Sequence, residues 1–239
     1  MPQYLGVDRP WLLAYLGLVG AACRTAPGPV LPAGAQPVSS GRVAQWVAVT
    51  VPSESRLHRF KWLFVDERAS AGGKGSARVV PPDSLRFDVA GPFGSGAASA
   101  VVVGQRAIWT EPPDAIAKLV PNYPLMWAMF GVAMLPAEGV EIRGLAQDSV
   151  TIWQYAGPAD TVQYSRTAGN PVRFYAEVRH AGELIGRAET TLRPDGAPIK
   201  ARLTVPSAPA KLDLTFLSTT PATFAPDIWL PRIPQHARP

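Results

Sequence analysis

The feature that most constrains the fold is a series of short segments in the second half of the chain, in which apolar and polar residues alternate. Each is predicted to form a β-strand, and the six segments are residues 150–155, 161–167, 172–179, 184–192, 199–205 and 211–217. The breaks between them are short and rich in glycine and proline, which is typical of tight turns. Short connections make neighbouring strands antiparallel, so this half predicts a meandering antiparallel sheet.

The first half of the chain continues this pattern and brings the expected number of strands to about eleven. Its five segments are residues 57–67, 73–80, 84–89, 97–103 and 105–110. One face of the predicted sheet is apolar and the other is largely polar or charged. Such a sheet must curl around its apolar face or be covered by other elements. We therefore expect a mainly β protein, an open (unclosed) antiparallel barrel with helices covering the concave face.

Two segments have the periodicity of helices. The first carries Val43, Trp46, Val47 and Val51 on one face, with Ser39 or Ser40 placed to cap it and a proline after it. The second covers residues 114–135, and its part from 123 to 135 has no charged residue. That part is too short to span a bilayer and is apolar on every side, so it must be buried in the curved sheet. It either completes the core or acts as a lid that a ligand displaces.

The N-terminus has the features of an export signal. Residues 11–22 are uncharged and mostly apolar, a length typical of the hydrophobic region of a signal peptide. Small residues then precede Cys23, the only cysteine, which resembles the lipobox of bacterial lipoproteins. We expect a signal peptide over residues 1–22, a lipidated Cys23 that begins a Pro/Gly-rich tether over 23–40, and a single β domain over 41–239. The alternatives are a plain secretory signal with an incidental cysteine, or a membrane-associated N-terminal helix.

Composition argues against several functional classes. The formal net charge is +5, but the basic residues are scattered singly, which does not favour nucleic-acid binding and is compatible with a mild attraction to anionic membranes. A single cysteine excludes an internal disulfide and a multi-cysteine metal site. His58, His180 and His236 have no metal-like spacing, and residues 94–96 lack the frame of a nucleophile elbow. We expect no enzymatic activity and no cofactor.

The stretch from about residue 60 to 145 resembles the lipoprotein-sorting proteins of the bacterial envelope, the periplasmic carrier LolA and the outer-membrane receptor LolB. The resemblance lies in an aromatic-rich first strand, the segment Ser-Leu-Arg-Phe-Asp-Val at 84–89, the loop Pro92-Phe93-Gly94, and the segment 131–136. The order of elements also agrees with that family's open eleven-stranded barrel, so that the resemblance spans roughly residues 40–220. The proline-rich tether departs from the family, and so does the lack of recognisable basic residues that would contact cargo.

This resemblance implies a hydrophobic cavity between sheet and helices that accepts acyl chains, and a membrane-contact role for Phe93 on the loop after the third strand. Phe93 could instead fold back onto the core. The aromatic and methionine residues placed to line the cavity are Trp62, Phe87, Trp109, Met126, Trp127, Phe130, Trp153, Tyr164 and Phe174.

The expected function is that of a monomeric, lipid-anchored envelope protein that faces the periplasm and is expected at the outer membrane. It would bind lipid or lipoprotein acyl chains and help to localise lipoproteins. The alternative is a structural or assembly lipoprotein that docks proteins on the same scaffold, with its interior simply filled. A hydrolase of envelope material is the least favoured hypothesis.

Overall fold

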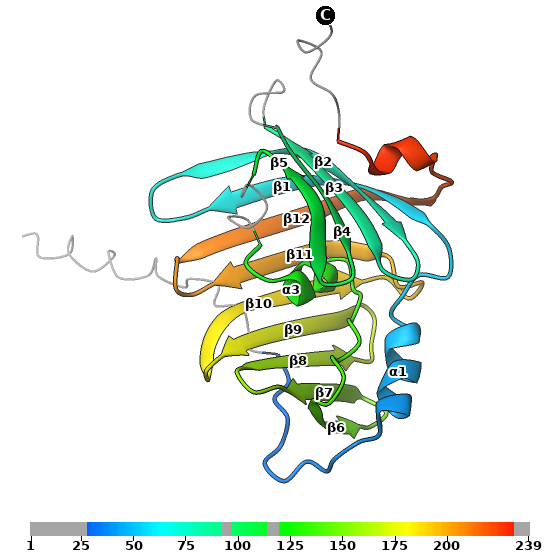
Figure 1. The fold of residues 1–239 in the computed structure, drawn as a ribbon, viewed down its shortest axis with the longest axis vertical. Helices are drawn as coiled ribbons and strands as arrows, with labels where there is room; N and C mark the ends of the chain where they lie inside the picture. Colours follow the sequence, from blue (N-terminus) through cyan, green and yellow to red (C-terminus); the bar gives the residue numbers. More distant parts are fainter. Residues whose placement is uncertain (1–27, 92–96, 114–119, 232–239) are drawn as a thin grey trace, which may run out of the picture.

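A computed structural model describes residues 28–91, 97–113 and 120–231 of the chain. Its centre is one twelve-stranded antiparallel sheet in the order β5-β4-β3-β2-β1-β12-β11-β10-β9-β8-β7-β6 (Figure 1). The strands are β1 (Arg56–Val65), β2 (Ser70–Val80), β3 (Ser84–Ala90), β4 (Ala97–Val103), β5 (Arg106–Glu111), β6 (Glu141–Ala146), β7 (Val150–Ala156), β8 (Asp160–Thr167), β9 (Val172–His180), β10 (Glu183–Leu192), β11 (Pro198–Val205) and β12 (Ala210–Pro221). The helices are α1 (Ser40–Ala48), α3 (Tyr123–Ala128) and the 3-10 helix η2 (Pro226–Trp229).

The expectation of an open antiparallel barrel with helices on its concave face is confirmed. The two edge strands, β5 and β6, are consecutive in the sequence, and the chain passes between them through α3, around which the sheet bends (Figure 1). All eleven predicted strands are present, and β6 is an additional one. Its sequence gives a weak strand signal because Gly144 stands at its centre. That glycine is needed there, since a Cβ would lie 2.0 Å from the ring of Trp153 on β7.

Helix α1 is confirmed, and the second predicted helix is only partly right. Ser39 caps α1 by accepting a hydrogen bond from the backbone N–H of Arg42, and Val43 and Val47 are buried. Helix α3 ends at Ala128, and the chain then turns at Gly131, which has a positive φ of 78°. Residues 129–135 therefore continue as a non-helical segment, and residues 114–119 lie outside the described part. The predicted burial of this apolar stretch is nevertheless correct for residues 124–133.

The segment before α1, which we expected to be a tether, contacts the domain from Gly28 onward. The Gln163 side chain on β8 donates a hydrogen bond to the Pro29 carbonyl (3.1 Å), and its Oε1 accepts one from the Leu31 N–H (3.4 Å). Farther along, Val38 N–H donates to the Ile142 carbonyl and Gly144 N–H to the Gln36 carbonyl, which extends the sheet beside β6. Backbone pairing at this edge overrides the low structural preference of a Pro/Gly-rich sequence. Within the described residues, no helix is long and apolar enough to cross a membrane.

Candidate functional site

The concave side of the sheet was the predicted ligand cavity, and large apolar side chains fill it. Seven of the nine predicted lining residues are buried in one cluster, and these are Phe87, Met126, Trp127, Phe130, Trp153, Tyr164 and Phe174. Trp62 is half-buried against the same cluster. Ring contacts run through it, with centroids 5.5 Å apart for Phe60 and Phe87 and 5.9 Å apart for Phe130 and Phe216. The residues that would contact an acyl chain thus contact one another.

Residues 120–135, called the plug below, occupy the centre of this cluster. They hold few polar contacts with the rest of the domain. The Trp127 indole N–H donates to the Gly104 carbonyl (2.7 Å), and the Thr190 hydroxyl donates to the Ala128 carbonyl (2.7 Å). Beyond α3, the N–H of Ala133 donates to Thr50 Oγ1 (2.9 Å) and that of Met134 to the Tyr164 hydroxyl (3.3 Å). Single side-chain hydroxyls therefore fix the C-terminal half of the plug.

A pocket of about 380 Å³ opens onto the plug at one end of the barrel. Its wall combines residues 48–53 after α1, the turn around Asp195 and Gly196, and the plug residues Phe130 and Val132. Thr50 belongs to this wall, and its hydroxyl also donates to the Val47 carbonyl (2.8 Å) at the end of α1. The plug is thus reachable from outside at the place where a single hydroxyl holds it. We call this pocket the mouth of the barrel.

His58 lies at the inner side of the mouth and is a buried strand residue. It is only 3% exposed and lies against the rings of Phe130 and Phe216, with centroids 5.6 and 5.8 Å away. Burial, reinforced by the positive charge of Arg56, lowers the pKa of His58 to about 4. Its Nδ1 is 3.0 Å from Thr219 Oγ1, so that the neutral ring keeps a polar partner. The interior thus excludes charge even where it contains an ionisable group.

Trp109 does not belong to the concave interior, and the prediction for this residue is wrong. It projects from β5 to the outer face of the sheet, where its indole N–H donates to the Trp229 carbonyl (2.7 Å). The ring also packs against Arg86 of β3, whose guanidinium carbon is 5.1 Å from the ring centroid. The β-bulge between Val101 and Val102, in the pairing of β4 with β5, shifts the alternation by one residue. Alternation alone could not show that shift.

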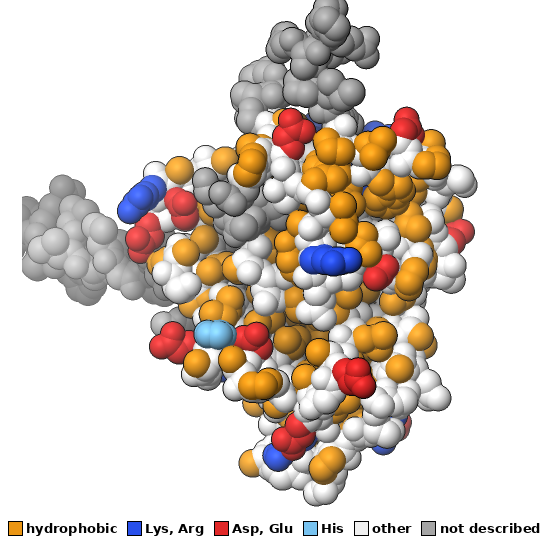
Figure 2. All heavy atoms as spheres, viewed as in Figure 1, with side chains coloured by type: hydrophobic (Ala, Val, Ile, Leu, Met, Phe, Trp, Pro, Cys, Tyr) orange, Lys and Arg blue, Asp and Glu red, His pale blue; other side chains and the backbone are white. Residues whose placement is uncertain are grey.

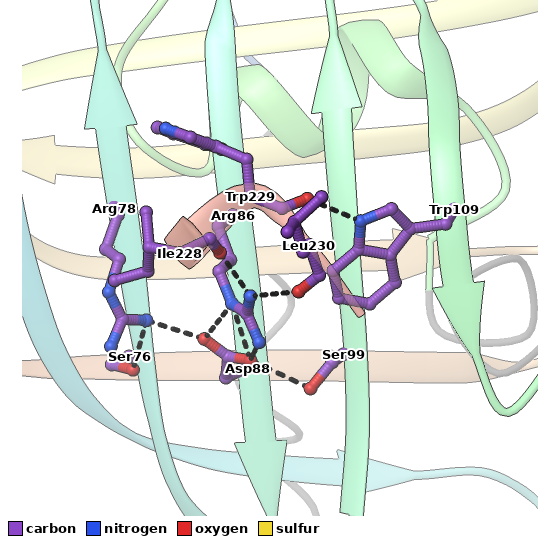
Figure 3. Close-up of polar contacts among 9 residues, drawn as sticks. All are labelled: Ser76, Arg78, Arg86, Asp88, Ser99, Trp109, Ile228, Trp229 and Leu230. Atoms are coloured by element: carbon purple, nitrogen blue, oxygen red, sulfur yellow. Dashed lines mark hydrogen bonds and ion pairs between the residues drawn. The ribbon is translucent and has the colours of Figure 1, made fainter. Parts of the chain in front are cut away.

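Arg86 and Asp88 form the centre of a polar cluster on this outer face, spread over the neighbouring strands β2 to β5 (Figure 3). Arg86 is 2% exposed and donates from Nε and Nη2 to the Asp88 carboxylate at 3.0–3.1 Å. Arg78 approaches the same carboxylate to 2.6 Å, and the Ser99 hydroxyl to 2.8 Å. Burial alone would raise the pKa of Asp88, but the hydrogen bonds from Arg86 and Ser99 and the two arginine charges hold it below its usual value.

The C-terminal residues 226–230, called the strap below, cover this cluster. Arg86 Nη1 donates to the carbonyls of Ile228 and Leu230 (3.0 Å for Leu230), and Trp109 donates to the carbonyl between them. Our sequence reasoning missed both the cluster and the strap. The available signal was the alternation that places Arg78, Arg86 and Asp88 on the polar face, together with a late apolar Ile-Trp-Leu segment flanked by prolines.

On the remaining surface of the described residues, the side chains form no cluster that points to catalysis. A pocket of about 600 Å³ lies on the outer face, where Lys61, Lys200 and Arg202 alternate with Glu189 and Asp213. Figure 2 shows acidic and basic side chains scattered among hydrophobic ones on the face it presents. Among the described residues, no group of three His, Cys, Asp or Glu side chains could hold a metal ion. Cys23 and Phe93 lie outside the described residues, so their roles in lipidation and membrane contact stay predictions.

Comparison with known proteins shows which structural class the fold belongs to. No family model matches the chain, and no curated protein matches it in sequence. Among solved structures, it is similar to a LolA superfamily protein from Nitrosomonas europaea, with a TM-score of 0.54 and 10% identity over 79% of this chain and 97% of that chain. A lipoprotein-sorting domain from Vibrio parahaemolyticus gives 0.36 with 8% identity (80% and 97% covered), and the MucA/MucB complex of Pseudomonas aeruginosa gives 0.34 with 15% identity (81% and 60% covered).

The class is therefore that of open antiparallel barrels that bend around a helix-bearing connection between their edge strands. Within that class, the chain has the LolA/LolB-like fold. The resemblance that the sequence suggested is confirmed at the level of the fold.

Proposed function

We propose that this chain is an envelope protein, lipid-anchored through Cys23, whose barrel binds the acyl chains of lipids or lipoproteins by displacing the plug. The observation that carries the proposal is the plug itself. It is an apolar segment that fills the concave side of an open sheet, yet single hydroxyl groups hold its C-terminal half beside a mouth. An acyl chain that replaced the plug would contact the same aromatic side chains. Burial of its apolar surface would contribute about 25 cal/mol per Å² to the free energy of binding.

The position of the N-terminal segment supports an anchored domain. Gly28 lies against Tyr175 on the outer face of β9, where a Cβ would come within 2.9 Å of the ring. Cys23 precedes Gly28 by five residues, which span about 18 Å at most when fully extended. An acylated Cys23 would therefore hold the outer face of β8 and β9 close to the membrane. The barrel mouth, whose wall begins at the C-terminal end of α1, would stay accessible to a periplasmic ligand.

A fluorescent fatty-acid assay tests acyl-chain binding. The full-length chain with Cys23→Ser, which lacks the lipid acceptor, is titrated with dansyl-labelled undecanoic acid, alone and combined with Thr50→Val or Tyr164→Phe. Each of these changes leaves a plug N–H without its partner, which destabilises the closed plug by about 1–2 kcal/mol. The apparent affinity for the fatty acid should therefore rise about 5- to 30-fold. The matched control is Thr215→Val, an exposed threonine on the outer face of β12.

The filled interior favours a second candidate, a structural or assembly lipoprotein that docks proteins on the same scaffold. Under this hypothesis the plug is permanent core, and none of the variants binds the fatty acid, although circular dichroism shows them folded. That result would refute lipid carriage. The anchor has its own test, because mass spectrometry of the membrane fraction should find an acylated Cys23. A soluble, unmodified mature chain would contradict it.

A further inference from the structure

The structure assigns a second binding site to the outer face: the Arg86–Trp109 cluster is a peptide-binding site, which the strap occupies in the same chain. We propose that it accepts an apolar, proline-flanked peptide segment of another protein, with the strap as its intramolecular competitor. This site lies on the opposite side of the sheet from the plug and does not depend on the proposed acyl-chain binding.

The first argument is the chemistry of the contacts. The strap presents three successive carbonyls, those of Ile228, Trp229 and Leu230, to donors on Arg86 and Trp109. A buried guanidinium needs acceptors for its N–H groups. Asp88 satisfies one side of Arg86, and the strap carbonyls satisfy Nη1. The cluster is thus built to bind a peptide main chain in this conformation (Figure 3).

The second argument is that the hydrogen bonds from Arg86 and Trp109 go to the backbone of the strap, whose side chains are exposed or only half-buried. No residue of η2 is buried, and Leu230 is 62% exposed. The Trp229 indole points away from the Arg86 guanidinium (Figure 3). Another peptide with the same backbone course could therefore make the same three hydrogen bonds. A segment without a fully buried side chain is also released more readily than a core strand.

The third argument is that the receptor side is fixed before any peptide arrives. Arg78 and Arg86 are directly opposite each other on β2 and β3, and their like charges would repel. Asp88 bonds both arginines and is itself held by Ser99 of β4, so the guanidinium of Arg86 keeps its orientation. Preorganised donors of this kind lower the entropic cost of binding.

The test uses a fluorescein-labelled synthetic peptide with the sequence of residues 225–231 (Ala-Pro-Asp-Ile-Trp-Leu-Pro) and measures fluorescence anisotropy. The chain truncated after Ala225 should bind the peptide, and a peptide of scrambled sequence should bind more weakly. The full-length chain should bind about tenfold more weakly than the truncated chain, if the strap acts at about 1 mM effective concentration against a Kd of about 100 μM.

Two variants of the truncated chain give a matched comparison. Trp109→Phe removes the donor to the Trp229 carbonyl and should weaken peptide binding about fivefold. Trp62→Phe removes an indole N–H that donates to the Ala90 carbonyl (3.2 Å), remote from the strap, and should leave peptide binding unchanged. A folded truncated chain that does not bind the peptide, or equal binding by the two variants, would overturn the proposal.

Hydrogen exchange on the full-length chain covers the case in which truncation prevents folding. The strap N–H groups of Ile228 and Leu230 should exchange much faster than those of β3 and β4, and faster still with excess unlabelled peptide. Strap protection equal to that of β3 would show a permanent part of the fold and overturn the site. A concentration-dependent dimer that is lost on truncation would assign the site to a second copy and overturn the choice of a foreign peptide.

Discussion

The two faces of the sheet are both covered by segments of the same chain, but by different physical means. The plug on the concave side is an apolar segment that is buried from Pro124 to Ala133. The strap on the outer side has no buried residue in its helix and is held by hydrogen bonds from Arg86 and Trp109 to its carbonyls. Apolar burial is insensitive to direction, whereas hydrogen bonds require fixed partners. The concave side is therefore suited to ligands defined by apolar area, and the outer site to ligands defined by backbone geometry.

The largest expected effect comes from replacing a tryptophan in the plug and comparing it with one in the strap. Trp127→Ala removes a side chain that is 1% exposed, together with its hydrogen bond to the Gly104 carbonyl. It should destabilise the protein by about 3–5 kcal/mol. Trp229→Ala keeps the strap carbonyls and should cost less than about 1 kcal/mol. Urea denaturation measures the free energy of unfolding of both variants. Similar losses of stability would contradict the distinction between the plug and the strap.

A pH titration tests whether the concave interior excludes charge. Because the pKa of His58 falls from 6.5 to about 4 on folding, the unfolded chain binds the proton more readily. This contribution to stability is fully present above pH 6.5 and is lost as the pH falls toward 4, by about 3 kcal/mol at most. His58→Gln should flatten the dependence of the unfolding free energy on pH in that window. An unchanged slope would mean that His58 is hydrated and that the interior is more open than the packing indicates.

A variant of Arg86 tests the outer face, where, unlike at the neutral His58 of the interior, a charged side chain is buried and paired. Arg86→Met should lower the free energy of unfolding by about 2 kcal/mol. The loss is smaller than it would be if Asp88 were left without any partner, because Asp88 keeps its contacts with Arg78 and Ser99. The matched control, Arg173→Met, removes an exposed partner of Glu189 and should cost less than about 1 kcal/mol. Equal effects from thermal unfolding would show that the buried cluster contributes no more than a surface ion pair.

The sequence predicted most of the sheet because alternation and turn residues are local signals. It failed where a contact between distant residues decides the structure. Strand β6 was missed because Gly144 makes room for Trp153, and β2 begins at Ser70, three residues before the predicted strand 73–80, within a glycine-rich stretch. In that stretch, a Cβ on Gly75 would come within 2.3 Å of the Phe60 ring.

The sequence predicted most of the residues that line the interior, but it did not predict how they pack against one another. The aromatic residues of the interior follow from their alternation on the strands, with Trp109 as the exception caused by a bulge. That these residues pack against the plug depends on how volumes fit, and a linear pattern does not contain this information. The position of the strap could not be predicted because Arg86 and Trp109 bind its backbone carbonyls, a group that every residue carries.

The smallest expected effect separates the two ends of the plug. Thr190→Val removes a hydroxyl that donates to the Ala128 carbonyl, but that carbonyl also accepts from the Gly131 N–H at 2.9 Å. The loss should therefore be about 0.5–1 kcal/mol, and fatty-acid binding should hardly change. The neighbouring Thr191→Val, which projects to the outer face, serves as the control. If Thr190→Val increased fatty-acid binding as much as Thr50→Val, the whole plug would move as one unit. If only Thr50→Val acts, the plug opens from the mouth and α3 stays in place, because buried apolar side chains and the Trp127 hydrogen bond to the Gly104 carbonyl still hold α3.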